Sequence, residues 1–408
     1  MPEPDITPRV VHRPNLHYRQ WLGLILMLLA GVYIGRYLLP GVPPASLPTV
    51  TIDQNGERQI AFPTFWEAWD RLHEKFIGDL SDDTLMYGAV SGMISAAGDP
   101  YTVFADPDAT KQFNETLGGS FSGIGVEMGM RNGAVTVIAP LDGSPAQTAG
   151  IREGDIIVAV DDTPLTQDTT LDEVVQKIRG ARSTKVKLTV LHKGDQETAV
   201  ITITRDTIHI DSVKLDITDN IARITVTSFN EDTASQFLTA ARQITRQSVS
   251  GIILDLRNNP GGFLQSAVDI ASRFIPEGQL IVSERGTDTT EYKAEGNDIL
   301  NGIPLVVLVN EGSASSSEIL SGALRDNLQA SIIGTTTFGK GSVQELIKLK
   351  DGSSLRVTVA KWFTPSDHNI NESGIEPDIQ VEQNYDTTED EPLLRATEEI
   401  TKLINNAQ

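Results

Sequence analysis

Two nearly continuous apolar runs constrain the fold of this chain more than any other feature. Residues 251–254 read GIIL and residues 304–309 read PLVVLV, without the alternation that marks a strand with one face in water. Strands of this kind are buried on both faces, which is typical of a sheet covered by helices on both sides. An α/β layered domain is therefore predicted over residues 207–383. It also includes strands at IARITV and ASIIGT and helices near 234–245, 265–274 and 316–325.

Each of the two runs leads into an unusual turn. The first continues into DLRNNPGG at 255–262, where a proline and two glycines let the backbone approach a ligand closely. The second continues into NEGSASSSEILSGALRD at 310–326, where small residues open a helix and a serine lies in a field that favours negative charge. Function in such sheets resides just past the strand C-termini, so both turns are candidate site segments, although serine is also a common helix N-cap.

The composition limits the catalytic groups available. The chain has no cysteine, which excludes disulfides, thiolate metal sites and thiol catalysis. Of the six histidines only His209 and His368 belong to the α/β domain, and neither has a motif that marks a base or a metal ligand. Lysine is another base for serine. Lys340 lies in GTTTFGKGSVQ between two glycines, which leave room for close approach to another segment.

Nucleotides and nucleic acids are not expected as ligands. Residues 334–340 fit the G-x-x-x-x-G-K pattern of a P-loop, but Gly341 stands where a hydroxyl must bind Mg²⁺. A hairpin about Asp351-Gly352 is predicted to follow, whereas a P-loop must open a helix. The formal net charge of −22, from 33 Lys and Arg against 55 Asp and Glu, repels phosphate backbones.

The N-terminal region predicts a membrane anchor. Residues 21–39 form an apolar run interrupted only by Arg36, just long enough to span a bilayer. Arginines precede the run, so residues 1–20 are expected to be a cytoplasmic tail and the chain beyond residue 40 to face outward. Pro40 follows the run where a cleaved signal peptide would carry an A-x-A-like site, which favours an uncleaved signal-anchor and a tether over 40–62.

Helical segments are predicted on either side of the central domains. Residues 63–117 are expected to be a helical region, with two amphipathic helices before a stop at 98–100. The aromatic stripe that includes Phe65, Trp66 and Trp69 is typical of a core or an oligomer contact. A further amphipathic helix is expected over 384–408.

Residues 118–206 resemble a PDZ domain, a partly open β-barrel with helices. The resemblance rests on GIGV at 123–126, SPA at 144–146, AGI at 149–151 and GDII at 154–157. Such domains capture a peptide C-terminal carboxylate on backbone N–H groups while the peptide adds a strand. The match places the binding loop at Phe121, Gly123, Ile124, Gly125 and Val126, and the pocket for the last side chain beside Leu171, Val174 and Val175. The apolar spacing of these three residues and Ile178 predicts a helix over 171–178.

The whole chain from residue 60 resembles the carboxyl-terminal processing proteases, a bacterial and chloroplast family of serine endopeptidases. The resemblance rests on a helical region, a PDZ domain and then DLRNNPGG, NEGSASSSE and GTTTFGKGSVQ in that order. It implies that Ser315 is the nucleophile, Lys340 its general base and Gln344 the residue that positions the lysine. Ser316 competes for the nucleophile's role, because SSS departs from the more usual Ser-Ala-Ser.

The resemblance carries further implications. It implies a core of the crotonase/ClpP-like type and an oxyanion hole from the backbone N–H groups of Gly261 and Ser316, with Gly262 as the alternative to Gly261. No metal or organic cofactor is expected. The helices at 63–98 and the C-terminal helix resemble the ends through which the family forms homodimers.

The chemistry of a lysine base requires that its charge be disfavoured. A lysine in water has a pKa of about 10.4 and is protonated, so burial must lower the pKa of Lys340. An apolar surround from Phe338, Val343 and Trp362 is expected to do this, and neutral Gln344 can bind the amine without stabilising its charge.

The predicted protein is a bacterial, single-pass membrane endopeptidase with its catalytic domain outside the cytoplasm. It is expected to cleave proteins near their free C-termini, and the PDZ domain is expected to recognise those C-termini and gate activity. Arg179, just after the predicted PDZ helix, is a candidate reporter of the bound state. The alternative is a PDZ scaffold or C-terminal tail receptor on an inactive peptidase fold.

Overall fold

A computed structural model describes residues 50–52, 58–60, 62–131, 133–166, 169–384 and 386–407. The predicted cytoplasmic tail and signal-anchor lie outside these residues, as does most of the tether. Within the described ranges, every helix is too short or too polar to cross a membrane. The chain separates into two compact units, one up to Leu85 and one from Met86 onward, and each is described by itself.

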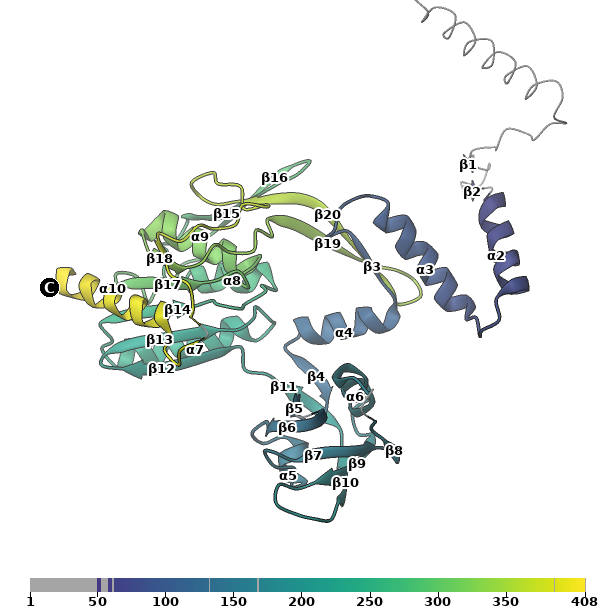
Figure 1. Cartoon of the computed structure of the whole chain (residues 1–408). Helices are drawn as coiled ribbons and strands as arrows, with labels where there is room; N and C mark the ends of the chain where they lie inside the picture. The colour runs from purple at the N-terminus through teal and green to yellow at the C-terminus, as the bar shows by residue number, and fades with distance from the viewer. Residues whose placement is uncertain are drawn as a thin grey trace, which may run out of the picture. The chain divides into compact units, whose positions relative to one another are not determined.

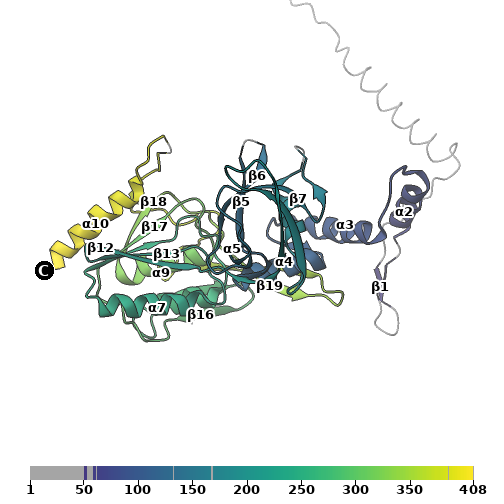
Figure 2. The same ribbon diagram turned by 90° about the horizontal axis from the view of Figure 1, so that it is seen from below.

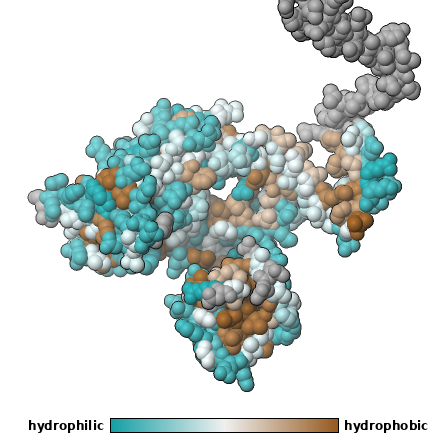
Figure 3. Space-filling model, viewed as in Figure 1, coloured by the Kyte–Doolittle hydropathy of each residue, from teal (hydrophilic) through white to brown (hydrophobic). Residues whose placement is uncertain are grey.

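The first unit contains the first of the two predicted helices and the start of the second. Strands β1 (Val50–Ile52) and β2 (Arg58–Ile60) form an antiparallel pair, and α2 (Pro63–Lys75) follows. Helix α3 (Asp82–Ser95) crosses the boundary between the units, so both predicted helices are present, but α3 lacks the distinct apolar face that was predicted for it. No side chain of α2 is buried, and its apolar residues remain at the surface (Figure 3). The aromatic stripe is therefore not a core within the described chain.

The second unit begins with β3 (Val103–Ala105) and α4 (Pro107–Leu117), which lead into the PDZ domain. The domain has a sheet in the order β10-β9-β7-β6-β5, with β8 paired to β7, and β4 pairs separately with β11 (Figure 1). The predicted helix over 171–178 is confirmed as α6 (Leu171–Ile178). The remaining elements are β4 (Ser120–Gly123), β5 (Val126–Arg131), β6 (Ala134–Pro140), α5 (Pro145–Thr148), β7 (Ile156–Val160), β8 (Thr163–Pro164), β9 (Lys185–Leu191), β10 (Ala199–Thr204) and β11 (Asp206–His209).

The predicted α/β domain has a six-stranded sheet in the order β12-β13-β14-β17-β18-β21, parallel except for β12. Every residue of β14 (Gly251–Asp255) and β17 (Leu305–Val309) is buried, which confirms the reading of the two apolar runs. The other strands are β12 (Val213–Thr218), β13 (Ile221–Val226), β18 (Ser331–Gly334) and β21 (Ile379–Gln380).

Helices cover both faces of this sheet. On one face, Ile252 and Leu254 pack in a cluster with α7 (Thr233–Arg246), α8 (Leu264–Ala271) and α9 (Ser316–Leu328). On the other, Ile253 packs against Ala396 and Ile400 of α10 (Glu391–Ala407). Figure 2 shows α7 and α10 on opposite sides of the sheet. Because alternate residues of β14 face these two covered sides, residues 251–254 contain no polar side chain, and Asp255 at the end of the strand is its one polar residue.

A second sheet supplies the lysine segment. Its order is β16-β15-β20-β19, from β16 (Thr289–Lys293), β15 (Leu280–Arg285), β20 (Ser354–Phe363) and β19 (Ser342–Lys348), and β3 also pairs with β20. The hairpin predicted about Asp351-Gly352 is confirmed as β19 and β20. A strand thus follows Lys340, which agrees with the rejection of a P-loop.

Candidate active site

The turn that carries Ser315 is strained, and the DLRNNPGG turn at 255–262 holds it in place. Ser315 precedes α9 with φ of +54° and ψ of −113°, a backbone conformation that non-glycine residues rarely adopt. The carbonyl of Asn259 accepts hydrogen bonds from the N–H of Ala314 (3.0 Å) and the hydroxyl of Ser317 (2.9 Å). Gly261 lies against the same segment, since a Cβ there would come within 2.8 Å of Ser315 Cβ. The two predicted site turns are therefore packed on each other.

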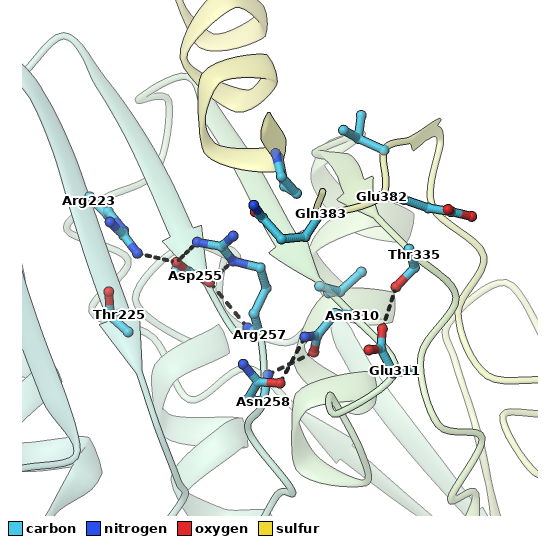
Figure 4. Close-up of a pocket in the computed structure, with 13 residues that line it drawn as sticks. Arg223, Thr225, Asp255, Arg257, Asn258, Asn310, Glu311, Thr335, Glu382 and Gln383 are labelled. Atoms are coloured by element: carbon cyan, nitrogen blue, oxygen red, sulfur yellow. Dashed lines mark hydrogen bonds and ion pairs between the residues drawn. The ribbon is translucent and has the colours of Figure 1, made fainter. Parts of the chain in front are cut away.

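Ion pairs and amide contacts fix the base of these turns (Figure 4). Buried Asp255, the last residue of β14, accepts hydrogen bonds from the guanidinium groups of Arg223 (2.7 Å) and Arg257 (2.8 and 2.9 Å). Asn310 Oδ1 accepts from the N–H of Asn258 (2.8 Å), and Asn310 Nδ2 donates to Asn258 Oδ1 (2.9 Å). These residues line a cavity of about 650 Å³ that does not include Ser315 or Lys340.

The predicted catalytic residues meet in a different cavity, of about 530 Å³. Its lining includes every predicted catalytic and oxyanion residue, namely Ser315, Lys340, Gln344, Gly261, Ser316 and Gly262. Neither His209 nor His368 lines it. Val343 and Trp362 line it as expected, but the expectation for Phe338 is wrong, because that side chain is 58% exposed outside the cavity.

Burial lowers the pKa of Lys340. Its pKa is lowered, first by loss of solvent and then by the positive charge of Arg356, against the opposing effect of Glu318. The Nζ atom lies 5.7 Å from the centroid of the Tyr101 ring. The direction of this shift is the one that a lysine base requires.

The contacts that would complete a catalytic dyad are not formed. Within the described residues, no hydrogen bond joins Ser315 Oγ to Lys340 Nζ, and Gln344 Nε2 donates to Ser342 instead, at 2.6 Å to Oγ. The prediction that Gln344 holds the lysine is therefore not met in this arrangement. The N–H of Gly261 donates to Asn259 Oδ1 at 2.9 Å, so its predicted oxyanion role requires that this bond open.

Sequence analysis did not identify Glu318, the residue that joins the two halves of the site. This fully buried carboxylate accepts hydrogen bonds from the N–H groups of Ser315 (2.7 Å), Gly339 (2.7 Å) and Lys340 (3.0 Å), and from Thr337 Oγ1 (2.5 Å). Burial raises its pKa, against the lowering effect of these bonds. The S-x-x-E spacing from Ser315 to Glu318, which is the pattern of a capping box, was the available signal.

The PDZ domain has a small groove of about 170 Å³ at the predicted peptide site. All five predicted loop residues line it, although Phe121 and Gly123 belong to strand β4 and Val126 to strand β5 rather than to a loop. Of the predicted helix residues only Val175 lines the groove. Leu171 does not, and Val174 is fully buried in the domain core, because it lies on the inward face of α6. Met128, Ile178 and Arg179 complete the lining.

Arg179 stacks on the groove, with its guanidinium carbon 4.8 Å from the centroid of the Phe121 ring. A peptide that occupies the groove would lie next to the Arg179–Phe121 contact.

The described residues hold no cluster of three or more histidine or acidic side chains that could bind a metal ion.

An α/β core with a serine and a lysine in one cavity, preceded by a PDZ domain, defines the class of PDZ-containing serine peptidases. Family models agree: residues 220–381 match peptidase family S41, residues 122–203 match the PDZ domain, and residues 42–109 match the N-terminal domain of the activating protease CtpB.

Relatives that align with most of the chain give the same result. A probable CtpA-like serine protease from Staphylococcus epidermidis is 34% identical to this chain, and the alignment covers 92% of this chain and 77% of the relative's length. The carboxy-terminal processing protease CtpB of Bacillus subtilis is 33% identical, and that alignment covers 87% of this chain and 75% of the length of CtpB. The chain belongs to the carboxy-terminal processing proteases, as the motifs predicted. A solved putative S41 protease from Bacteroides fragilis shares the fold, with 15% identity, a TM-score of 0.51, and coverage of 77% of this chain and 90% of that one.

Proposed function

We propose that the chain is a membrane-anchored endopeptidase that cleaves extracytoplasmic proteins near their C-termini with a Ser315–Lys340 dyad. The observation that carries the proposal is the shared cavity of Ser315, Lys340 and the oxyanion candidates. Neutral Lys340 takes the proton of Ser315 as its Oγ attacks the peptide carbonyl, and returns that proton to the departing amine. Water then attacks the acyl-enzyme, with Lys340 again as base, and releases the new C-terminus.

The oxyanion that forms in both steps needs two N–H donors. The N–H of Ser316 opens α9, where helix geometry provides no intrahelical acceptor. The second donor is Gly261, once its bond to Asn259 opens, or Gly262. A change that frees the second donor and joins Ser315 Oγ to Lys340 Nζ converts the described arrangement into a reactive one.

The PDZ domain controls this change. Helix α4 supports the proposal, because Phe113, Thr116 and Leu117 line the catalytic cavity while Lys111 and Glu115 of the same helix line a cavity with Arg179 of the PDZ domain. A substrate C-terminus that binds the groove better in the reactive arrangement shifts the population toward it.

Anchoring and assembly complete the proposal. Residues 21–39 hold the chain in a bacterial cell membrane, and the catalytic region faces outward. Exposed apolar side chains on α2, such as Trp66 at 56%, support a homodimer, because a second copy would cover them.

The proposal is tested by cleavage of a peptide with a free C-terminus. The wild-type protein is expected to cut it, and Ser315→Ala is expected to bind it without cutting. Ser316→Ala serves as the control. Ser316 Oγ donates a hydrogen bond to Gly262 O at 3.0 Å and is not the proposed nucleophile, so this variant should cut the peptide at a reduced rate. Binding without cleavage by the wild-type protein would instead favour the scaffold function.

A further inference from the structure

We propose that Glu284 makes the catalytic cavity select lysine or arginine as the substrate residue that supplies the scissile carbonyl. The inference rests on the proposed peptidase function and adds a substrate class to it. It combines two features of the cavity, an apolar wall close to the serine and a carboxylate without a cationic partner.

The wall lies where the acyl side of the substrate must lie. Ile319 is four residues beyond Ser315, about one turn along α9, and Leu264 is two residues beyond Gly262. The scissile carbonyl has to sit at Ser315 and the oxyanion donors, so the residue that carries it reaches these side chains first. Val343 and buried Trp362 extend the apolar surface.

The cavity also contains a carboxylate. Glu284 of β15 lines the same cavity and is half-buried, and its Oε2 accepts a hydrogen bond from the Tyr292 hydroxyl at 3.0 Å. Tyr292 in turn packs edge-on against Trp362, with ring centroids 5.9 Å apart. The polar group therefore adjoins the apolar wall.

No cation neutralises Glu284 within the described residues. Its neighbour Arg285 pairs with Asp367 and stacks on the Phe363 ring at 4.2 Å. The other charged residues of the lining are Lys340, which the proposed mechanism requires to be neutral, and Arg356, which stacks on the Phe113 ring at 4.6 Å.

An unpaired carboxylate next to apolar surface is unfavourable, and a substrate cation would satisfy it. Lysine and arginine offer the matching shape, because each has an apolar stem and a charged end. Burial and the Glu284 carboxylate raise the pKa of Tyr292, so its hydroxyl keeps the proton that it donates to Glu284.

The test uses the full chain and peptides that differ only at the residue before the scissile bond, lysine against its uncharged counterpart norleucine. All peptides share one C-terminal tail, so that the PDZ contribution is constant. We expect kcat/KM to be about 10- to 100-fold higher for lysine. Glu284→Gln should bring this ratio close to one.

Two control variants separate specificity from folding. Glu291→Gln changes an exposed carboxylate of β16 that pairs with Lys293, and should leave the ratio unchanged. Tyr292→Phe removes the hydroxyl but keeps the carboxylate, and should preserve the lysine preference. Equal ratios in the wild-type protein and Glu284→Gln would overturn the inference.

Failure of the proposed function gives a different result. If the wild-type protein cuts none of the peptides, the peptidase proposal fails, and calorimetry with Ser315→Ala still decides the inference. A cation pocket is supported if the lysine peptide binds more tightly than the norleucine peptide and Glu284→Gln abolishes this difference. Equal binding of the two peptides before the Glu284→Gln change would refute it.

Discussion

One oxygen of the Glu318 carboxylate accepts a hydrogen bond from the N–H of Lys340 at 3.0 Å, and the same oxygen accepts from the N–H of Ser315 at 2.7 Å. The segments that carry the proposed nucleophile and base approach each other through this buried carboxylate. Their backbone positions are thus coupled, although in the part of the chain that the structure describes no hydrogen bond joins Ser315 Oγ to Lys340 Nζ.

Replacement of Glu318 should uncouple the two segments. The amide in Glu318→Gln has one acceptor oxygen where the carboxylate has two. At least one of the four groups that donate to Glu318 therefore loses its acceptor, which should lower the unfolding free energy by about 1–3 kcal/mol. We expect kcat to fall at least tenfold and the melting temperature to drop. Kinetics and thermal unfolding measure both, with Glu345→Gln on the exposed side of β19 as the control. Unchanged kcat in Glu318→Gln would contradict the positioning role.

Activity should depend on pH through Lys340. Its pKa is lowered by burial and by Arg356, and only the neutral amine accepts a proton, so activity falls as the pH drops through that pKa. Arg356→Gln removes a positive neighbour and raises the pKa of Lys340, which moves the acidic limb of the kcat/KM profile to higher pH. A shift to lower pH, or none, would show that Arg356 does not act on the lysine.

The guanidinium of an arginine cannot take the place of the lysine base. Lys340→Arg keeps a positive charge that cannot be given up at working pH, so we expect complete loss of peptide cleavage with the fold retained. Peptide turnover and circular dichroism check the two parts of this expectation. Cleavage at even a tenth of the wild-type rate would exclude Lys340 as the base.

The glycine at 261 is required by space and by backbone conformation. Gly261 has φ of +98°, and an added Cβ would lie 2.8 Å from the Ala314 carbonyl oxygen. Gly261→Ala should therefore cost about 1–3 kcal/mol of unfolding free energy and abolish activity. Gly278→Ala is a matched control, since it also has positive φ but meets no atom within 4 Å. Equal stability loss in both variants would mean that backbone conformation alone explains the effect.

The PDZ groove should affect turnover and not only affinity. Arg179→Ala removes the contact with Phe121, and amidation of the substrate C-terminus removes the carboxylate that the groove is expected to bind. If binding gates the site, both changes lower kcat, whereas a pure tether would raise KM with kcat unchanged. Steady-state kinetics with the free and the amidated peptide distinguish these outcomes.

The elements of the fold were predictable where a local pattern determines them. Strands β14 and β17 follow from their apolar runs, because burial on both faces leaves a continuous apolar stretch, and α6 follows from its apolar spacing, because burial on one face leaves a helical period. Val174 was misplaced for a related reason. Helical spacing shows that its side chain is buried but not whether it faces the groove or the domain core.

The candidate site was predictable where motifs carry it, and not where distant segments meet. Ser315 and Lys340 come from their motifs, and the structure places both in one cavity. The roles of Glu318, Arg356 and Phe113 depend on contacts between elements far apart in the sequence. A single sequence has no local signal for such contacts, apart from the S-x-x-E spacing at Glu318.

The most direct test of the central claim is covalent labelling of the protein with a fluorophosphonate, followed by peptide mapping of the adduct. A serine activated by Lys340 should carry the label at Ser315, with a rate that falls on acidification and vanishes in Lys340→Arg. Label on Ser316, or undiminished labelling of Ser315→Ala, would contradict the assignment of Ser315 as the nucleophile.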